Sequence, residues 1–96
     1  MRARLLSRAE AELVEAMNYY GGQASGLGTR FLAEVEAAVA LIEAHPLAWM
    51  PRSSRARRCR VKHFPFGLLY QVRADEILIL AVMDLRRDPK RWEQFL

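Results

Sequence analysis

Cysteine and histidine are scarce in this 96-residue sequence, and this scarcity excludes several kinds of site. The one cysteine, Cys59, cannot form an internal disulfide or a cysteine metal cage, which fits a reducing compartment. The two histidines, His45 and His63, lack the spacing of a metal-binding pair. We therefore expect a cytoplasmic protein with no metal and no cofactor.

Long apolar runs and phosphate-binding glycine loops are also missing. No apolar stretch approaches the roughly 18 residues that a membrane span requires, and the N-terminal segment turns acidic too early for a signal peptide. The glycines of GGQASGLG (21–28) join two predicted helices instead of following a strand, so they do not match a phosphate loop. The composition is globular, with 52% hydrophobic and 27% charged residues, and the length predicts a single domain over residues 1–96.

Two helices are predicted from apolar residues at helical spacing. Ser7 and Glu10 match a capping box at the start of the first helix, and the glycine pair at 21–22 ends it. The second helix covers residues 27–44, because the residue before Pro46 avoids helical dihedrals. We expect the two helices to form an antiparallel hairpin that covers a sheet.

Short strands are predicted before and after this hairpin, at residues 2–6, 58–63, 66–73 and 77–83. The last of these, ILILAVM, is apolar at every position, which is typical of a central strand covered on both faces. The final residues, KRWEQFL, predict a short helix. The order predicts a two-layer α+β fold with an N-terminal strand, an α-helical hairpin, a three-stranded antiparallel meander and a short C-terminal helix.

Positive charge gathers in the second half of the chain. Residues 1–45 hold four Arg against six Glu, a net charge of −2, whereas residues 46–96 hold eleven Lys or Arg against five Asp or Glu, a net charge of +6. This segregation favours an anionic partner, either nucleic acid or an acidic protein segment.

The cations form two groups that are candidate binding residues. Arg58, Arg60 and Lys62 alternate along one strand face, with Cys59, Val61 and His63 on the opposite, apolar face. Arg86, Arg87, Lys90 and Arg91 follow the central strand. If the two groups meet, they form a concave basic site that could bind RNA, stabilise a phosphorane or receive an acidic peptide. A solvated outer face explains the strand row equally well.

The remaining reactive side chains do not predict a catalytic residue. Cys59 is expected to act as a small buried hydrophobe, and His63 is expected to be structural instead of a general base. Asp84 and Asp88 flank the arginine pair and could neutralise it. Trp92 is expected to pack against the sheet.

Four segments together resemble the RelE/ParE superfamily of toxins from bacterial toxin–antitoxin, or plasmid stabilisation, systems. They are AEAELVEAMNYY (9–20), GLGTRFLAEVEAAVALIEAHPLAWM (26–50), RRCRVKHFPFGLLYQV (57–72) and ILAVMDLRRDPKRW (79–92). The resemblance implies a compact β-α-α-β-β-β fold. It also implies a cognate antitoxin that wraps and neutralises the toxin, and a target in the translation or replication machinery.

The resemblance extends to two branches with different activities. The RelE-like branch cleaves mRNA in the ribosome; Arg60, Lys62 and Arg86 or Arg87 match its basic positions. However, Leu68 stands where it tends to carry an arginine, and Trp92 falls near its usual tyrosine. The ParE-like branch binds DNA gyrase without hydrolysis and is the branch that we favour.

Three hypotheses follow from this resemblance. The first is a ParE-like gyrase inhibitor neutralised by the acidic, amphipathic tail of its antitoxin, with which it forms a hetero-oligomer. The second is a ribosome-dependent mRNA endonuclease. The third is an inactive module that retains only antitoxin recognition.

Overall fold

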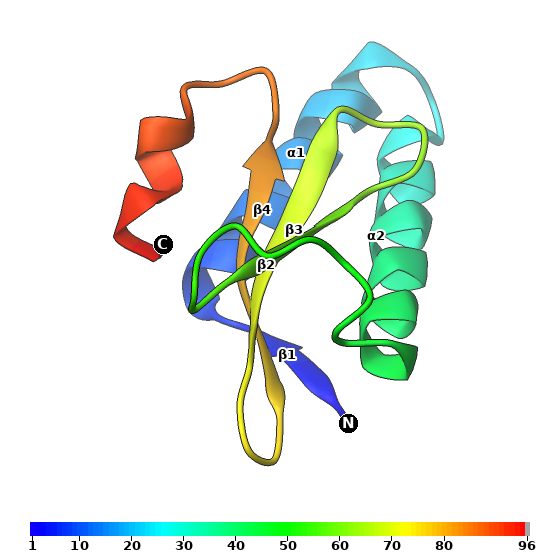
Figure 1. Cartoon of the computed structure of the whole chain (residues 1–96). Coiled ribbons are helices and arrows are strands. Elements are labelled where there is room, and N and C mark those ends of the chain that lie inside the picture. Colours follow the sequence, from blue (N-terminus) through cyan, green and yellow to red (C-terminus); the bar gives the residue numbers. More distant parts are fainter. Residues whose placement is uncertain (96) are drawn as a thin grey trace.

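The computed structural model describes residues 1–95, which form four strands, two α-helices and a C-terminal 3-10 helix (Figure 1). In chain order these are β1 (Ala3–Leu5), α1 (Ser7–Gln23), α2 (Leu27–Ala44), β2 (Arg57–Arg60), β3 (Phe66–Val72), β4 (Ile77–Asp84) and η1 (Pro89–Phe95). The type and order of the elements confirm the predicted α+β fold. None of the helices in this part of the chain is long and apolar enough to cross a membrane.

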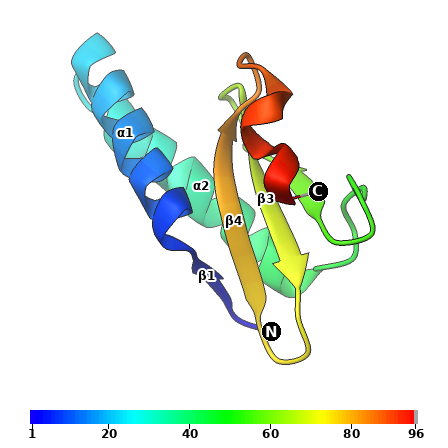
Figure 2. The same cartoon turned by 90° about the vertical axis from the view of Figure 1, so that its left-hand side faces the viewer.

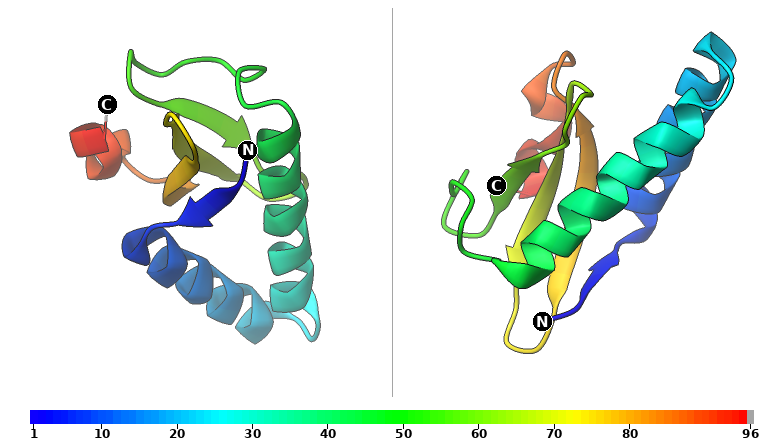
Figure 3. Two further views of the ribbon diagram at one scale, coloured as in Figure 1. Left: turned by 90° about the horizontal axis from the view of Figure 1, so that it is seen from below. Right: turned by 90° about the vertical axis from the view of Figure 1, so that its right-hand side faces the viewer.

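The four strands form one sheet in the order β1-β4-β3-β2. β2, β3 and β4 are the predicted antiparallel meander, and β1 pairs in parallel with β4. α1 and α2 cover one face of the sheet, while η1 lies against the other face (Figure 2, Figure 3). β4 is consequently buried from Ile77 to Met83, as its unbroken apolar sequence predicts.

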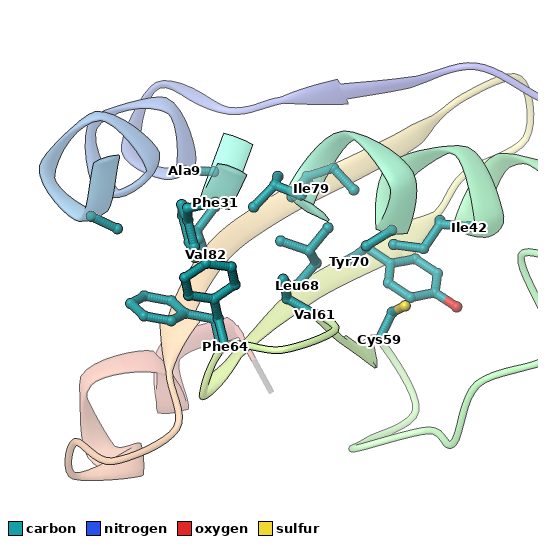
Figure 4. Close-up of a cluster of buried hydrophobic side chains, with 14 of the residues drawn as sticks. Ala9, Phe31, Ile42, Cys59, Val61, Phe64, Leu68, Tyr70, Ile79 and Val82 are labelled. Carbon is teal, nitrogen blue, oxygen red and sulfur yellow. The ribbon is translucent and has the colours of Figure 1, made fainter. Parts of the chain in front are cut away.

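The main core lies between the helices and the sheet (Figure 4). It includes a group of four aromatic rings, Tyr20, Phe31, Phe64 and Phe66, whose centroids lie 4.9–6.1 Å apart in the contacting pairs. Most of these pairs meet edge to face, the arrangement that the ring quadrupole favours. This packing fixes α1 and α2 against the end of the sheet at which β4 finishes.

A second apolar cluster lies on the opposite face of the sheet. Trp92 of η1 is only 2% exposed and packs with Leu69, Leu80 and Met83 of the sheet. The prediction that Trp92 packs against the sheet is therefore confirmed.

The two ends of α1 differ from the prediction. The extended residue before the helix is Leu6, not Ser7, and no side chain caps the helix, so the predicted capping box is wrong. Leu6 takes this place because its N–H donates to the Ile79 carbonyl and so continues the pairing of β1 with β4. The helix also runs through the glycine pair to Gln23, since glycine weakens a helix by about 1 kcal/mol per residue without breaking it.

Gly28 allows α1 and α2 to approach closely. A Cβ atom at Gly28 would lie 2.4 Å from the carbonyl oxygen of Met17 on α1. No side chain can occupy that space, so the start of α2 requires glycine here.

Candidate functional site

β2 carries the first group of predicted binding residues. Arg58 and Arg60 flank the buried Cys59, so they lie on the sheet face opposite the helices. The stem of Arg58 crosses Gly67 of β3, where a Cβ atom would lie 3.1 Å from Arg58 Cγ and Cδ. Burial, followed by the charges of Arg52 and Arg60, lowers the pKa of the Arg58 guanidinium.

Arg52, Arg58 and Arg60 form what we call the β2 arginine cluster. Within residues 1–95, none of the three side chains lies within ion-pair distance of a carboxylate. Like charges in one place disfavour one another's charged form, and an incoming anion relieves this repulsion. The cluster is therefore a candidate site for a carboxylate or a phosphate.

Arg57, which precedes Arg58 in β2, has a structural role. Arg57 Nη1 donates to the carbonyl oxygen of Trp49 at 2.7 Å and holds the loop that precedes β2. This loop also contributes Arg52, which sequence analysis missed because no periodic pattern places a loop residue beside a strand.

The chain leaves the strand after Arg60, which places Lys62 in an exposed turn. The prediction that His63 lies on the apolar face was consequently wrong. His63 adopts a left-handed conformation with φ of 68°, its side chain is 53% exposed, and its Nδ1 pairs with Glu34 Oε2 on α2. The pair ties this turn to α2.

The second group of predicted residues begins directly after β4. Arg86 donates from Nε to Asp84 Oδ1 and from Nη2 to Asp84 Oδ2, both at 3.0 Å. Arg87 is held more loosely, with Nε 3.6 Å from Asp84 Oδ2 and Nη2 3.9 Å from Glu15 Oε1 on α1. Asp84 therefore pairs with both arginines, as predicted, but its single charge balances only one of them. The same prediction for Asp88 was wrong, since within residues 1–95 the Asp88 carboxylate forms no ion pair and accepts from the Lys90 N–H instead.

The pKa of Asp84 reflects this arrangement. Burial raises the pKa of the carboxyl group, but the hydrogen bonds from Arg86 and the charges of Arg86 and Arg87 outweigh burial. The pKa of Asp84 consequently lies below its ordinary value, and the same pair raises the pKa of Arg86. Asp84 is thus an ion-pair partner and not a proton donor at neutral pH.

Glu12 of α1 fixes the position of η1. Glu12 Oε1 accepts a hydrogen bond from the Val82 N–H at 2.9 Å, and Oε2 accepts one from Trp92 Nε1 at 3.1 Å. Arg8 adds a hydrogen bond from Nη2 to the Arg91 carbonyl oxygen at 2.8 Å. Sequence analysis missed Glu12, because an acidic residue on an amphipathic helix normally indicates a solvated face.

A hollow of about 390 Å³ lies between α1, the end of β4 and η1, and we call it the α1–η1 hollow. Its apolar surface comes from Ala16, Tyr19, Phe66, Val82 and Trp92. Three arginines and three acidic residues line it as well: Arg86, Arg87, Arg91, Glu12, Glu15 and Asp84. β1 pairs with β4 only as far as Ile79. Beyond Ile79 the free edge of β4 faces α1, where Glu12 accepts from the Val82 N–H.

The predicted cations therefore occupy two different environments. Arg86 and Arg87 gather around Asp84, Arg91 stacks over Trp92 and Lys90 is exposed, whereas Arg58 and Arg60 join Arg52. In the described part of the chain, no ion pair or hydrogen bond joins the two groups.

The one thiol in the sequence is buried and is not activated as a nucleophile. Cys59 is 1% exposed, and burial raises the pKa of its thiol to about 11. A thiol of this kind remains protonated at neutral pH and is a poor nucleophile. The prediction that Cys59 is a small buried hydrophobe is confirmed.

Comparison with protein families identifies the class of this fold. The family model described as "ParE toxin of type II toxin-antitoxin system, parDE" matches residues 3–89. The chain belongs to the ParE toxin family. The match includes both helices, all four strands and the Asp84 ion pairs, and it ends at the first residue of η1.

A solved structure supports the same fold for this ParE-family chain. The chromosomal ParDE TA system from P. aeruginosa is similar with a TM-score of 0.72 and 17% sequence identity. The alignment covers 85% of this chain and 92% of that one. A comparison with curated proteins found no match. Membership of the ParE family implies an antitoxin partner.

Proposed function

We propose that this ParE-family toxin inhibits DNA gyrase by binding it, without catalysis, and that a cognate antitoxin neutralises it in the cytoplasm. The observation that carries the proposal is the β2 arginine cluster, whose three guanidinium groups lack carboxylate partners within residues 1–95. Gyrase as the target follows from the resemblance to the ParE-like branch.

Acid–base chemistry has little support near this cluster. Cleavage of RNA by proton transfer requires a group that gives and takes a proton near neutral pH. The Trp92 indole is buried and donates to Glu12, and an indole cannot accept a proton. Among the described residues, the nearest histidine along the chain from β2, His63, is turned to Glu34. These features favour binding over hydrolysis.

The second candidate is a RelE-like, ribosome-dependent mRNA endonuclease that contacts phosphates through Arg60, Lys62 and Arg86 or Arg87. The exposure of Arg60 and Lys62 supports it. Two features oppose it. Arg86 is already held by both oxygens of Asp84, and the buried Leu68 stands where that branch tends to carry an arginine.

The antitoxin is proposed to place carboxylates of an acidic, amphipathic tail on the basic half of this chain. Such a tail would neutralise Arg58 and Arg60 and form a hetero-oligomer with the toxin. Lys62, Arg86, Arg87, Lys90 and Arg91 extend the proposed target- or antitoxin-binding surface.

Expression of the chain alone in bacteria tests the proposal. Growth arrest accompanied by lost supercoiling or gyrase-dependent DNA breaks supports gyrase inhibition. Cleavage of mRNA in translating ribosomes supports the endonuclease instead. Normal growth with confirmed soluble expression leaves only the inactive module that recognises the antitoxin.

Charge reversal tests the antitoxin surface separately. In R58E/R60E the affinity for the antitoxin should fall, and the dependence of affinity on salt should become weaker, because fewer ion pairs form. The matched control is R2E/R30E, which changes the net charge equally at exposed positions elsewhere. Equal affinity and equal salt dependence in wild type and R58E/R60E would show that the antitoxin does not bind Arg58 and Arg60.

A further inference from the structure

We propose that the α1–η1 hollow is a binding site for an acidic side chain of the antitoxin that is flanked by apolar residues. This inference rests on the proposed antitoxin partnership and adds a second contact, separate from the β2 arginine cluster.

The apolar part of the inner surface of the hollow comes from buried side chains that are held in place. Val82 and Trp92 are each 2% exposed, and Ala16 is 6% exposed. Val82 is fixed in β4, and both Val82 and Trp92 are held by Glu12. At about 390 Å³ the hollow lies at the small end of ligand sites, large enough for a few side chains instead of a cofactor.

Arg87 and Arg91 have unused donors at this hollow. Neither guanidinium donates a hydrogen bond to any other residue within 1–95. The ion pair of Arg87 with Glu15 spans 3.9 Å, and the Glu15 side chain is 73% exposed. Arg91 lies with Cζ 5.7 Å from the centre of the Trp92 ring, a stacked contact that leaves its N–H groups open.

The other charges of the hollow are already matched. Asp84 is neutralised by Arg86, and Glu12 accepts two hydrogen bonds and pairs with Arg8. Arg87 lies near Glu15 and Asp84, so the three carboxylates of Glu12, Glu15 and Asp84 stand against four arginines, Arg8 included. The excess is one positive charge, and Arg91 supplies it. A carboxylate can accept two parallel hydrogen bonds from such a guanidinium while its stem rests on the apolar surface.

A peptide fits this site better than a nucleic acid. A phosphate backbone would bring several negative charges close to Glu15 on the rim of the hollow, and Glu15 would repel them. A peptide with one carboxylate between apolar side chains brings only a single negative charge. The occupant is assigned to the antitoxin because it is the one partner that family membership implies.

A short peptide provides a direct test with the purified full chain. The probe is acetyl-Leu-Glu-Leu-amide, and the control peptide is acetyl-Leu-Gln-Leu-amide, which has the same shape without the charge. NMR titration should show about tenfold weaker binding of the glutamine peptide, because hydrogen bonds to charged groups contribute more than neutral ones. The signals that move should include the Trp92 indole N–H and the Tyr19 ring.

Matched variants locate the contact. R91Q should weaken binding of the glutamate peptide by about tenfold, and R30Q, an equal charge change on the exposed surface of α2, should change it less than twofold. Equal binding of the two peptides, unchanged binding by R91Q, or binding of an oligothymidylate in preference to the peptide would each overturn the proposal. This assay contains no gyrase and no antitoxin, so its failure is separable from failure of the proposed function, which growth arrest reports.

Discussion

Removal of the Glu12 carboxylate should destabilise the fold more than removal of any exposed acid on α1. Its two oxygens accept from the Val82 N–H and from Trp92 Nε1, and both donor residues are 2% exposed. E12A leaves two buried donors without an acceptor. Each such donor costs about 1–3 kcal/mol, so the free energy of unfolding should fall by about 2–6 kcal/mol.

This loss is large enough for a clear measurement. For a chain of this size even the lower limit of about 2 kcal/mol corresponds to a Tm lower by about 8–16 °C, at about 4–8 °C per kcal/mol. Urea unfolding monitored by tryptophan fluorescence measures it, since Trp92 is one of the two tryptophans. E12Q retains one acceptor oxygen and should lose about half as much.

Glu15 provides the control on the same helix. It is 73% exposed and its one ion pair spans 3.9 Å, so E15A should change the free energy of unfolding by less than about 0.5 kcal/mol. If E12A is as stable as E15A, Glu12 does not hold η1 and β4 together, and the reasoning is refuted.

Three further predictions concern the backbone and pH. G28A should lower the free energy of unfolding by about 1–3 kcal/mol, because its Cβ atom would lie 2.4 Å from the Met17 carbonyl oxygen. G21A, whose Cβ atom would have no atom within 4 Å, should stabilise α1. Equal stabilities of G28A and G21A in urea unfolding would contradict this. His63 has φ of 68°, so H63G should be more stable than H63A by about 1–2 kcal/mol, both variants lacking the imidazole; the reverse order would exclude strain at this turn. The folded-state pKa of Asp84 is lowered, so its stabilisation is full above about pH 5 and is lost as the pH falls through and below about 4. The stability difference between wild type and D84N should therefore shrink between pH 6 and pH 3, and a difference independent of pH would oppose this.

Local patterns predicted the elements that depend on local forces. α2 has the predicted bounds, because its apolar face and Pro46 act within a few residues of the chain. The burial of β4 on both faces followed from its unbroken apolar run, since both layers that cover it are apolar. The capping box failed because pairing of Leu6 with Ile79, a contact between distant parts of the chain, decides where α1 begins.

The candidate site was predicted by residue type but not by environment. Charge counting identified both Arg58 and Arg86 as candidate binding residues. In the structure, Arg86 forms an ion pair with Asp84, whereas the stem of Arg58 packs over Gly67. Residue spacing encodes neither environment. The Arg86 ion pair depends on a side-chain rotamer, and the position of the Arg58 stem depends on a glycine in the adjacent strand. His63 was misplaced for a similar reason, since the alternation of a strand ceases where the chain turns.

If this toxin acts by binding gyrase through the β2 arginine cluster, a supercoiling assay with purified gyrase should depend on Arg58 and Arg60. Wild type and R2E/R30E should inhibit supercoiling at similar concentrations. R58E/R60E should require at least tenfold more protein, which corresponds to a loss of about 1.4 kcal/mol in binding free energy. Inhibition by R58E/R60E at the wild-type concentration, or no inhibition by a wild type that cleaves mRNA on ribosomes, would contradict this mechanism.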